Sequence, residues 1–120
     1  MSTFDAMTIQ VTDLERSLAF YRLIGLTIPE AMSRSFATLQ PTGPTRIDWS
    51  TTPGCATGAG DRIAMGVRCR DADELDRIHL ALVDAGHEVQ AAPHVAPWGA
   101  RVCRAVDPDG HIVELYVALP

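Results

Sequence analysis

One stretch of the chain, residues 97–117, reads PWGARVCRAVDPDGHIVELYV and predicts a β-hairpin. The turn is Asp107-Pro108-Asp109-Gly110, because Pro108 presets φ, the aspartate side chains can cap backbone amides, and Gly110 tolerates a positive φ. Apolar runs flank this turn on both sides, as expected for two paired strands. The hairpin is therefore the element around which a sheet can be built.

A carboxylate interrupts the second apolar run of the hairpin. Successive side chains of a strand point to opposite faces, so Glu114 and Tyr116 share one face while Val113 and Leu115 share the other. An unpaired carboxylate is costly in an apolar core. Glu114 therefore predicts that its face of the strand looks into a wet cavity.

Composition limits the fold and the partners. The chain has 120 residues, 47% of them hydrophobic and 21% charged, which suffices for one core and predicts a single domain over residues 1–120. Ten Lys and Arg against 15 Asp and Glu give a net charge of −5 and a pI near 5.2. This balance opposes attraction to nucleic acid or to an anionic membrane surface.

The cysteines and the N-terminal residues indicate the compartment. Cys55, Cys69 and Cys103 form neither a CxxC pair nor a zinc-like spacing, so we expect reduced thiols. The first residues lack the basic and apolar regions of a signal peptide, and no run approaches the roughly 20 apolar residues that span a bilayer. We therefore expect a cytoplasmic protein without a membrane segment.

The first half of the chain predicts a strand, a helix and shorter extended pieces. Apolar side chains alternate from Met7 to Val11, which indicates a half-buried strand. Thr12 with Glu15 three residues on resembles a capping box, and Gly25 ends the helix that follows. Extended pieces are expected at residues 27–29, 35–40 and 45–50.

The same pattern then starts again. Alternation from Ile63 to Val67 predicts a strand, and a helix opens at Asp71 with Glu74 and ends at Gly86. A strand at 87–91, a loop at 93–97 and the hairpin complete this half. The organisation is βαβββ twice, with modules of about 1–52 and 61–120 joined by a linker at 53–60.

Two motifs carry a resemblance to a known family. They are Val11-x-Asp13-Leu14-x-Arg16-Ser17-x-x-Phe20-Tyr21, followed by Gly25-Leu26, and Asp107-Pro108-Asp109-Gly110-x-x-x-Glu114-Leu115. In this order, around a second strand and helix, they resemble the vicinal oxygen chelate superfamily of glyoxalase I, extradiol dioxygenases and bleomycin-resistance proteins. The resemblance implies an α+β fold in which two tandem βαβββ modules form a curved mixed sheet, a half-barrel cup that contains the site.

The resemblance also implies where a metal would be held. Metalloenzymes of the family bind a divalent ion through His, Glu or Gln on the first and last strands of each module, and the matching positions here are Ala6, Asp48, Arg62 and Glu114. Alanine has no donor atom, and a guanidinium repels a cation. We therefore expect no metal and no cofactor, with Arg62 bridging Asp48 and Glu114 across the cup.

Trp98 is the strongest candidate for ligand contact, because Pro97 and Gly99 hold it in an irregular, accessible place. Tyr116 and Phe36 are candidates for the second face of an aromatic stack, whereas Trp49 is expected to pack against a helix. The phrases Pro97-Trp98-Gly99-x-Arg101 and Arg46-Ile47-x-Trp49 resemble the drug-binding branch of the family, the mitomycin-binding and bleomycin-binding resistance proteins.

Polar side chains complete the predicted ligand site. Glu114, Tyr116 and Gln10 are expected to line one side of the cup, and Arg62 and Asp48 to offer hydrogen-bonding groups to the ligand. We interpret the chain as a non-catalytic protein that sequesters or carries an aromatic, drug-like natural product. The resemblance further implies a homodimer with a two-fold interface.

Two enzyme hypotheses stand beside this one. The first is a metal-dependent lyase, isomerase or dioxygenase with Glu114 as ligand or base, which the missing histidine ligands disfavour. The second is a metal-free enzyme with Glu114 as general base, which would need a carboxyl pKa raised by burial.

Overall fold

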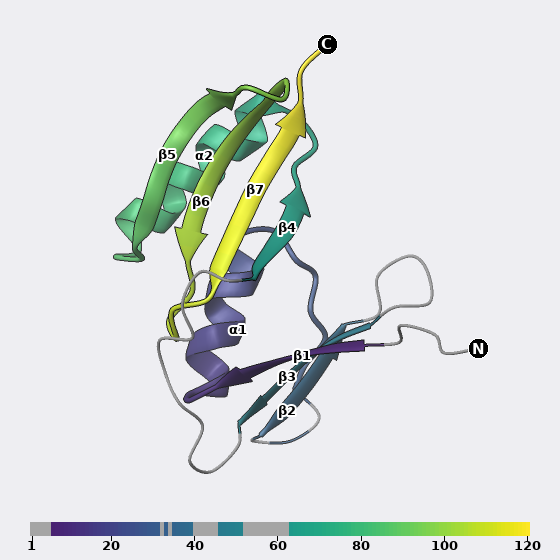
Figure 1. Ribbon diagram of the computed structural model, residues 1–120. Helices are drawn as coiled ribbons and strands as arrows, with labels where there is room; N and C mark the ends of the chain where they lie inside the picture. Colours follow the sequence, from purple (N-terminus) through teal and green to yellow (C-terminus); the bar gives the residue numbers. More distant parts are fainter. Residues whose placement is uncertain (1–5, 32, 34, 40–45, 52–62) are drawn as a thin grey trace, which may run out of the picture.

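The computed structural model describes residues 6–31, 33, 35–39, 46–51 and 63–120, so Arg62 and the expected linker at 53–60 lie outside the described residues. The described elements, in chain order, are β1 (Ala6–Val11), α1 (Leu14–Leu23), β2 (Phe36–Leu39), β3 (Arg46–Thr51), β4 (Ala64–Arg68), α2 (Ala72–Asp84), β5 (Val89–Ala96), β6 (Ala100–Val106) and β7 (Ile112–Ala118). The described elements are two helices and two separate sheets, arranged as in Figure 1, which confirms the α+β prediction. Neither described helix is long and apolar enough to cross a membrane.

The two sheets share one topology, except that sheet B has a fourth strand. Sheet A has the order β1-β3-β2 and sheet B the order β4-β7-β6-β5. In each sheet the strand before the helix pairs in parallel with the last strand of its half, and the other pairs are antiparallel. The second half has the predicted βαβββ order, whereas the described residues of the first half form βαββ.

The strand expected at residues 27–29 does not form. The guanidinium of Arg22 donates instead to the carbonyl oxygens of Ile28 and Pro29, at 3.3 and 3.0 Å. Pro29 has no amide hydrogen to give to a sheet. A side chain from α1 therefore takes the backbone acceptors that a neighbouring strand would have used.

The helix starts differ by one residue from the prediction in the first half and agree with it in the second. Asp13, not Thr12, caps α1, because its side chain accepts from the amide of Arg16 at 3.1 Å. Thr12 donates to another carboxylate, described below. Asp71 caps α2 as predicted, accepting from the amide of Glu74 at 2.8 Å.

Both helices end on the predicted glycines. Gly25 and Gly86 have φ values of +105° and +81°, which residues other than glycine rarely adopt. The amide after each glycine bonds back to the last turn, Leu26 to the carbonyl of Tyr21 and His87 to that of Leu82. These are Schellman motifs, which satisfy the last helical carbonyls and turn the chain sharply.

Strand β5 corrects the expected strand at 87–91 and the expected loop at 93–97. The strand continues through Pro93 to Ala96, with register shifts between Val89 and Ala91 and between Ala91 and His94. β5 is at the edge of sheet B, and Pro93 falls at the register shift between Ala91 and His94, where it has no register partner on β6, so its missing amide hydrogen is tolerated. Proline therefore marked a tolerated edge position and not the end of the strand.

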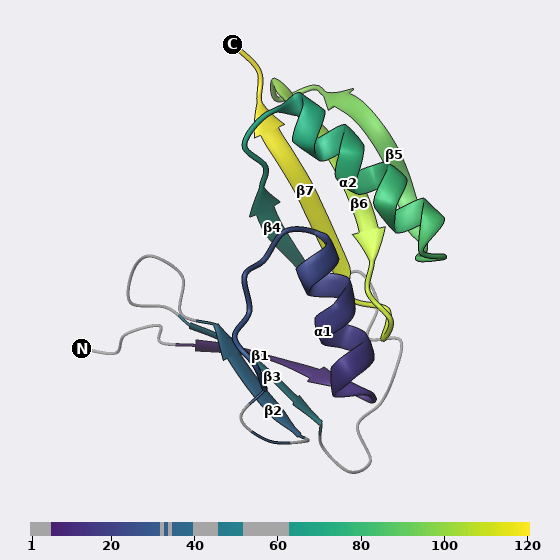
Figure 2. The ribbon, with the colours of Figure 1, turned by 180° about the vertical axis from the view of Figure 1, so that it is seen from behind.

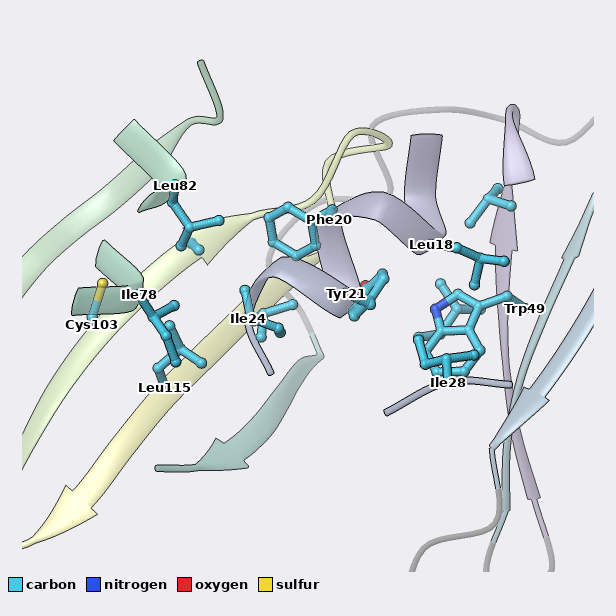
Figure 3. Packing of buried hydrophobic residues seen from close by; sticks show 14 of the residues in the cluster. Leu18, Phe20, Tyr21, Ile24, Ile28, Trp49, Ile78, Leu82, Cys103 and Leu115 are labelled. Atoms are coloured by element: carbon cyan, nitrogen blue, oxygen red, sulfur yellow. The ribbon is translucent and has the colours of Figure 1, made fainter. Parts of the chain in front are cut away.

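One hydrophobic core joins both halves. Figure 2 shows α2 lying across sheet B, with α1 next to sheet A and to the lower end of sheet B. The core takes side chains from both helices and both sheets, and its largest fully buried members include Trp49, Tyr21, Phe20, Ile24, Leu75, Leu82 and Leu115. Figure 3 shows Trp49 pointing from β3 toward Tyr21, at a ring separation of 5.2 Å. The predicted packing of Trp49 against a helix is confirmed.

The turn after β6 attaches the second half to the first. Asp107 Oδ2 accepts from the Tyr21 hydroxyl at 2.8 Å, and its Oδ1 accepts from the amides of Asp109 and His111. Asp109 Oδ1 accepts from both the amide and the hydroxyl of Thr12, at 3.2 and 2.6 Å. Both carboxylates are buried and hydrogen-bonded, as buried charges must be. The predicted amide caps are confirmed, and the contacts with α1 are additional.

Alkaline pH tests this attachment. Burial, and next the charge of Asp107, raise the pKa of the Tyr21 hydroxyl well above its ordinary value of 10.0. Above pH 10 the unfolded chain releases this proton while the folded chain keeps it. The free energy of unfolding should therefore fall with rising pH, by about 1.4 kcal/mol per pH unit. Urea unfolding of the parent and of Tyr21→Phe between neutral pH and pH 11 measures this.

Tyr21→Phe should lower the free energy of unfolding at neutral pH by about 1–3 kcal/mol, because Asp107 loses a buried donor. It should also show a shallower alkaline decline than the parent. Thr12→Val, which loses a bond to Asp109, is the control and should keep the parent slope. Equal alkaline slopes for the parent and Tyr21→Phe would contradict the account.

Candidate functional site

The side chains of β7 alternate between a buried face and a partly exposed face, as the sequence predicted. Val113 and Leu115 are fully buried in the core, whereas Glu114 and Tyr116 are partly exposed on the opposite face. Figure 1 shows this opposite face toward the viewer, with α2 behind the sheet. We call it the open face of sheet B; by strand phase it carries Gly66 and Arg68 from β4, Val102 and Arg104 from β6, and Glu114 and Tyr116 from β7.

Trp98 is held over this face by a three-residue hairpin loop between β5 and β6. The amide of Gly99 bonds to the carbonyl of Ala96 at 3.0 Å, with Pro97 and Trp98 at the centre of the turn. Gly99 has a φ of +87°, and its own carbonyl accepts from the amide of Leu119. The indole is thus 63% exposed on an ordered turn.

The structure brings Trp98 and Tyr116 together. Their ring centroids lie 6.4 Å apart at an interplanar angle of 60°, which is an edge-type contact. The guanidinium carbon of Arg68 lies 6.0 Å from the centroid of the Tyr116 ring, within the range of a cation–π contact. The result is a row of aromatic and cationic groups across the open face of sheet B.

Glu114 lies beside this row, between a glycine and an arginine. Its register partners are Gly66 on β4 and Arg104 on β6. A methyl group added at Gly66 would meet only the Tyr116 ring, at 3.6 Å, so the face is open next to Glu114. Arg104 is half-buried, and its Nε atom is buried without a hydrogen-bond partner among the described residues. The sequence reasoning missed Arg68 and Arg104.

Gln10, Phe36 and Asp48 lie on the other sheet. Strand phase places all three on the face of sheet A opposite Trp49, which we call the open face of sheet A. Asp48 is buried there, accepting from the Thr38 hydroxyl at 2.7 Å and from Arg46 Nε at 3.2 Å. Its neighbours on β2 and β3 therefore satisfy this carboxylate.

The predicted site residues therefore form two groups within one chain. Trp98, Tyr116 and Glu114 share the open face of sheet B, and the other described candidates share that of sheet A. Both sheets turn their opposite faces toward the shared core, so the open faces point away from it (Figures 1 and 3). A bridge from Arg62 to Asp48 and Glu114 stays a prediction, because Arg62 lies outside the described residues.

The described residues of one chain bring no metal-donor set together. Ala6 offers no donor atom, and within one chain Asp48 and Glu114 lie on different sheets. Within the described part of the chain, no three His, Cys, Asp or Glu side chains form a group that could hold an ion. Arginines, not imidazoles, lie beside Glu114 on the open face of sheet B, and a guanidinium disfavours a nearby cation.

The described cysteines are poor nucleophiles. Cys69 and Cys103 are both buried, and burial raises the pKa of each thiol to about 11. The reactive form of cysteine is the thiolate, which is scarce at neutral pH when the pKa is this high. Neither thiol therefore supports covalent chemistry in the described structure.

Comparisons with known proteins agree with this architecture. A profile described as Glyoxalase/Bleomycin resistance protein/Dioxygenase superfamily matches residues 3–115. No curated protein sequence matches the chain significantly. Among solved structures, a glyoxalase-related enzyme from Fulvimarina pelagi has a TM-score of 0.79 at 22% identity, covering 98% of this chain and 88% of its own.

Two further structures are titled with the name of the same superfamily. A family enzyme from Burkholderia phytofirmans has a TM-score of 0.78 at 17% identity, covering 96% of this chain and 98% of its own. A member from Sphaerobacter thermophilus has a TM-score of 0.69 at 25% identity, covering 98% of each chain. These similarities support the fold over the full length of the chain.

The donor set predicts a protein without a resident metal. Purified protein should contain far less than one zinc, nickel, iron or manganese per chain, because the family positions include Ala6 and Arg62. Elemental analysis after dialysis measures this. Ala6→His is a matched variant that restores one imidazole donor, and its metal content should rise only if the other positions converge. About one metal ion per parent chain would contradict the expectation.

Proposed function

The chain belongs to the glyoxalase/bleomycin resistance protein/dioxygenase superfamily, and from this membership we propose that it is a small-molecule binding protein that holds an aromatic ligand unchanged. The ligand class is a planar natural product, such as an antibiotic or a related secondary metabolite. The open face of sheet B is the binding surface, and Trp98 forms one wall of the site.

The observation that carries this proposal is the exposed indole of Trp98 on an ordered turn. An indole without a binding role normally packs into the core, as Trp49 does here. Trp98 instead stands next to the Tyr116 ring on a face that no described helix covers. Aromatic rings arranged in this way stack on planar ligands and add only a small cost in conformational entropy.

The polar groups beside the rings fit ligand orientation better than catalysis. Glu114 can accept a hydrogen bond from the ligand, and the neighbouring arginines can donate to carbonyl or hydroxyl oxygens. The neighbour from Fulvimarina pelagi is named a glyoxalase-related enzyme, so turnover is the alternative outcome. Conversion of a bound ligand would identify Glu114 as the first residue to test as a general base.

A homodimer would complete the site. No described helix covers the open face of either sheet, and the two faces point away from each other in one chain because the shared core lies between the sheets (Figure 3). A two-fold dimer can bring the open face of sheet A of one protomer toward that of sheet B of its partner. Gln10, Phe36 and Asp48 would then join the site, as the sequence prediction requires.

Substitution of Trp98 tests the binding proposal. A screen of aromatic antibiotics and quinones by isothermal titration calorimetry should find a ligand whose affinity falls about ten- to a hundredfold in Trp98→Ala, because one stacking partner contributes roughly 1–3 kcal/mol. Trp98→Phe should recover part of the loss. Leu80→Ala is the matched control, since Leu80 is a similarly exposed apolar side chain (62%) on α2.

Two outcomes would contradict the binding proposal. In the first, a ligand found by the screen binds Trp98→Ala as tightly as it binds the parent. In the second, chromatography after incubation shows that the ligand has become a product. The second outcome supports an enzyme on the same face of sheet B.

Light scattering tests the dimer. Two chains of 13.0 kDa should give a particle of about 26 kDa at micromolar concentration. Phe36→Glu, on the open face of sheet A, should shift the population toward the monomer, because it places a charge on the predicted interface. A parent particle of 13 kDa would contradict the expectation.

A further inference from the structure

We propose that the ligand held on the open face of sheet B is an aromatic acid, and that Arg104 binds its carboxylate. This inference rests on the proposed function and names the chemical class of its ligand. The ring of the acid lies against Trp98 and Tyr116, and its anionic group lies over the row that contains Glu114 and Arg104.

The first observation is that Arg104 has no carboxylate partner among the described residues, whereas four other arginines have one. Ion pairs with aspartate or glutamate are formed by Arg46, Arg70, Arg77 and Arg101. In a chain with 15 acidic residues against 10 basic ones, such pairing is the expected state. Among the described residues, neither Arg68 nor Arg104 forms an ion pair, and both lie on the open face of sheet B.

The second observation is the environment of Arg104. It is half-buried, its neighbours Cys103 and Ala105 are fully buried, and its Nε atom meets no acceptor among the described residues. Glu114 is directly opposite in register, yet no ion pair joins these two side chains. A buried Nε without an acceptor is unfavourable, and a ligand carboxylate bound to the remaining N–H groups of the same guanidinium would offset part of that cost.

The third observation is how the charges are placed along the face. Arg68 and Arg104 stand on strands to either side of β7, about 10 Å apart across the sheet, with Tyr116 and Glu114 between them. Tyr116 lies at the level of the sheet that is nearer Trp98, so that level is aromatic. Arg104 lies two residues farther along the strands, at the level of Glu114. A planar acid spans these two levels, with its ring at the aromatic end and its carboxylate at Arg104.

Charge balance at the face favours an anion. Among the described residues that β4, β6 and β7 place on it, two arginines exceed a single glutamate, although the chain as a whole carries −5. Glu114 adds selectivity in two ways. It repels an anion that approaches Arg104 from the β7 side, and it accepts a hydrogen bond from a ligand hydroxyl. Arg68 keeps its cation over the Tyr116 ring and so supports the aromatic end.

Two probes of equal shape test the inference, namely 2-naphthoate and 2-naphthamide, titrated by calorimetry at neutral pH and low salt. The parent should bind naphthoate at least about tenfold more tightly than naphthamide, because only the acid forms charge-assisted bonds with Arg104. Arg104→Gln should reduce this ratio to about one without weakening naphthamide. Arg104→Lys should give an intermediate ratio, since it keeps the positive charge and loses the parallel N–H donors of the guanidinium.

Arg101→Gln is the matched control for position. Arg101 lies on the same strand and points to the helix side, where it bonds to Asp76 at 2.9 Å, so its loss should leave the ratio unchanged. Trp98→Ala should weaken both probes by a similar factor and keep the ratio. Added salt should lower the ratio in the parent and have little effect in Arg104→Gln.

The outcomes separate this inference from the proposed function. If the parent binds both probes equally, or if Arg104→Gln keeps the preference for naphthoate, the inference is overturned and the binding site stands. The inference also falls if neither probe binds while another aromatic compound binds in a Trp98-dependent way. If no aromatic compound binds at all, both proposals fail.

Discussion

The buried hydrogen bonds of Asp107 and Asp109 are the interaction on which the rest of this structure depends. These carboxylates lie in the turn that joins β6 to β7, and their donors come from the chain around α1. The side chain of His111 adds a contact of 3.0 Å to the carbonyl oxygen of Gln10. One short turn therefore fixes a hairpin of sheet B, the start of α1 and the shared core with respect to one another.

Local chemistry made much of the fold predictable. Alternation along β7, the capping residue Asp71 and the glycines that end both helices each act within a few residues, so they could be read from the sequence and agree with the structure. The failures involve distant partners. Thr12 suits a helix cap, but Asp109, 97 residues away, takes its hydroxyl.

The candidate site was less predictable for a related reason. An arginine between apolar residues, such as Arg68 or Arg104, reads as an ordinary solvated position on a strand. Only the register across three strands shows that both flank Glu114 and Tyr116. Trp98 could be identified early because proline and glycine on either side are a local signal. Its contact with Tyr116 follows from pairing between β6 and β7, the hairpin that the turn at residues 107–110 predicted.

The edge strand β5 affects how copies of this protein meet at high concentration. A regular edge strand offers unpaired amides and carbonyls that can template another chain and start fibrillar aggregation. β5 lacks one amide hydrogen at Pro93 and is shifted twice in register against β6, so its outer edge cannot present an even ladder. Strand addition at this edge is thereby discouraged. The open face of sheet B therefore ends, on its β5 side, at an edge that pairs poorly with another strand.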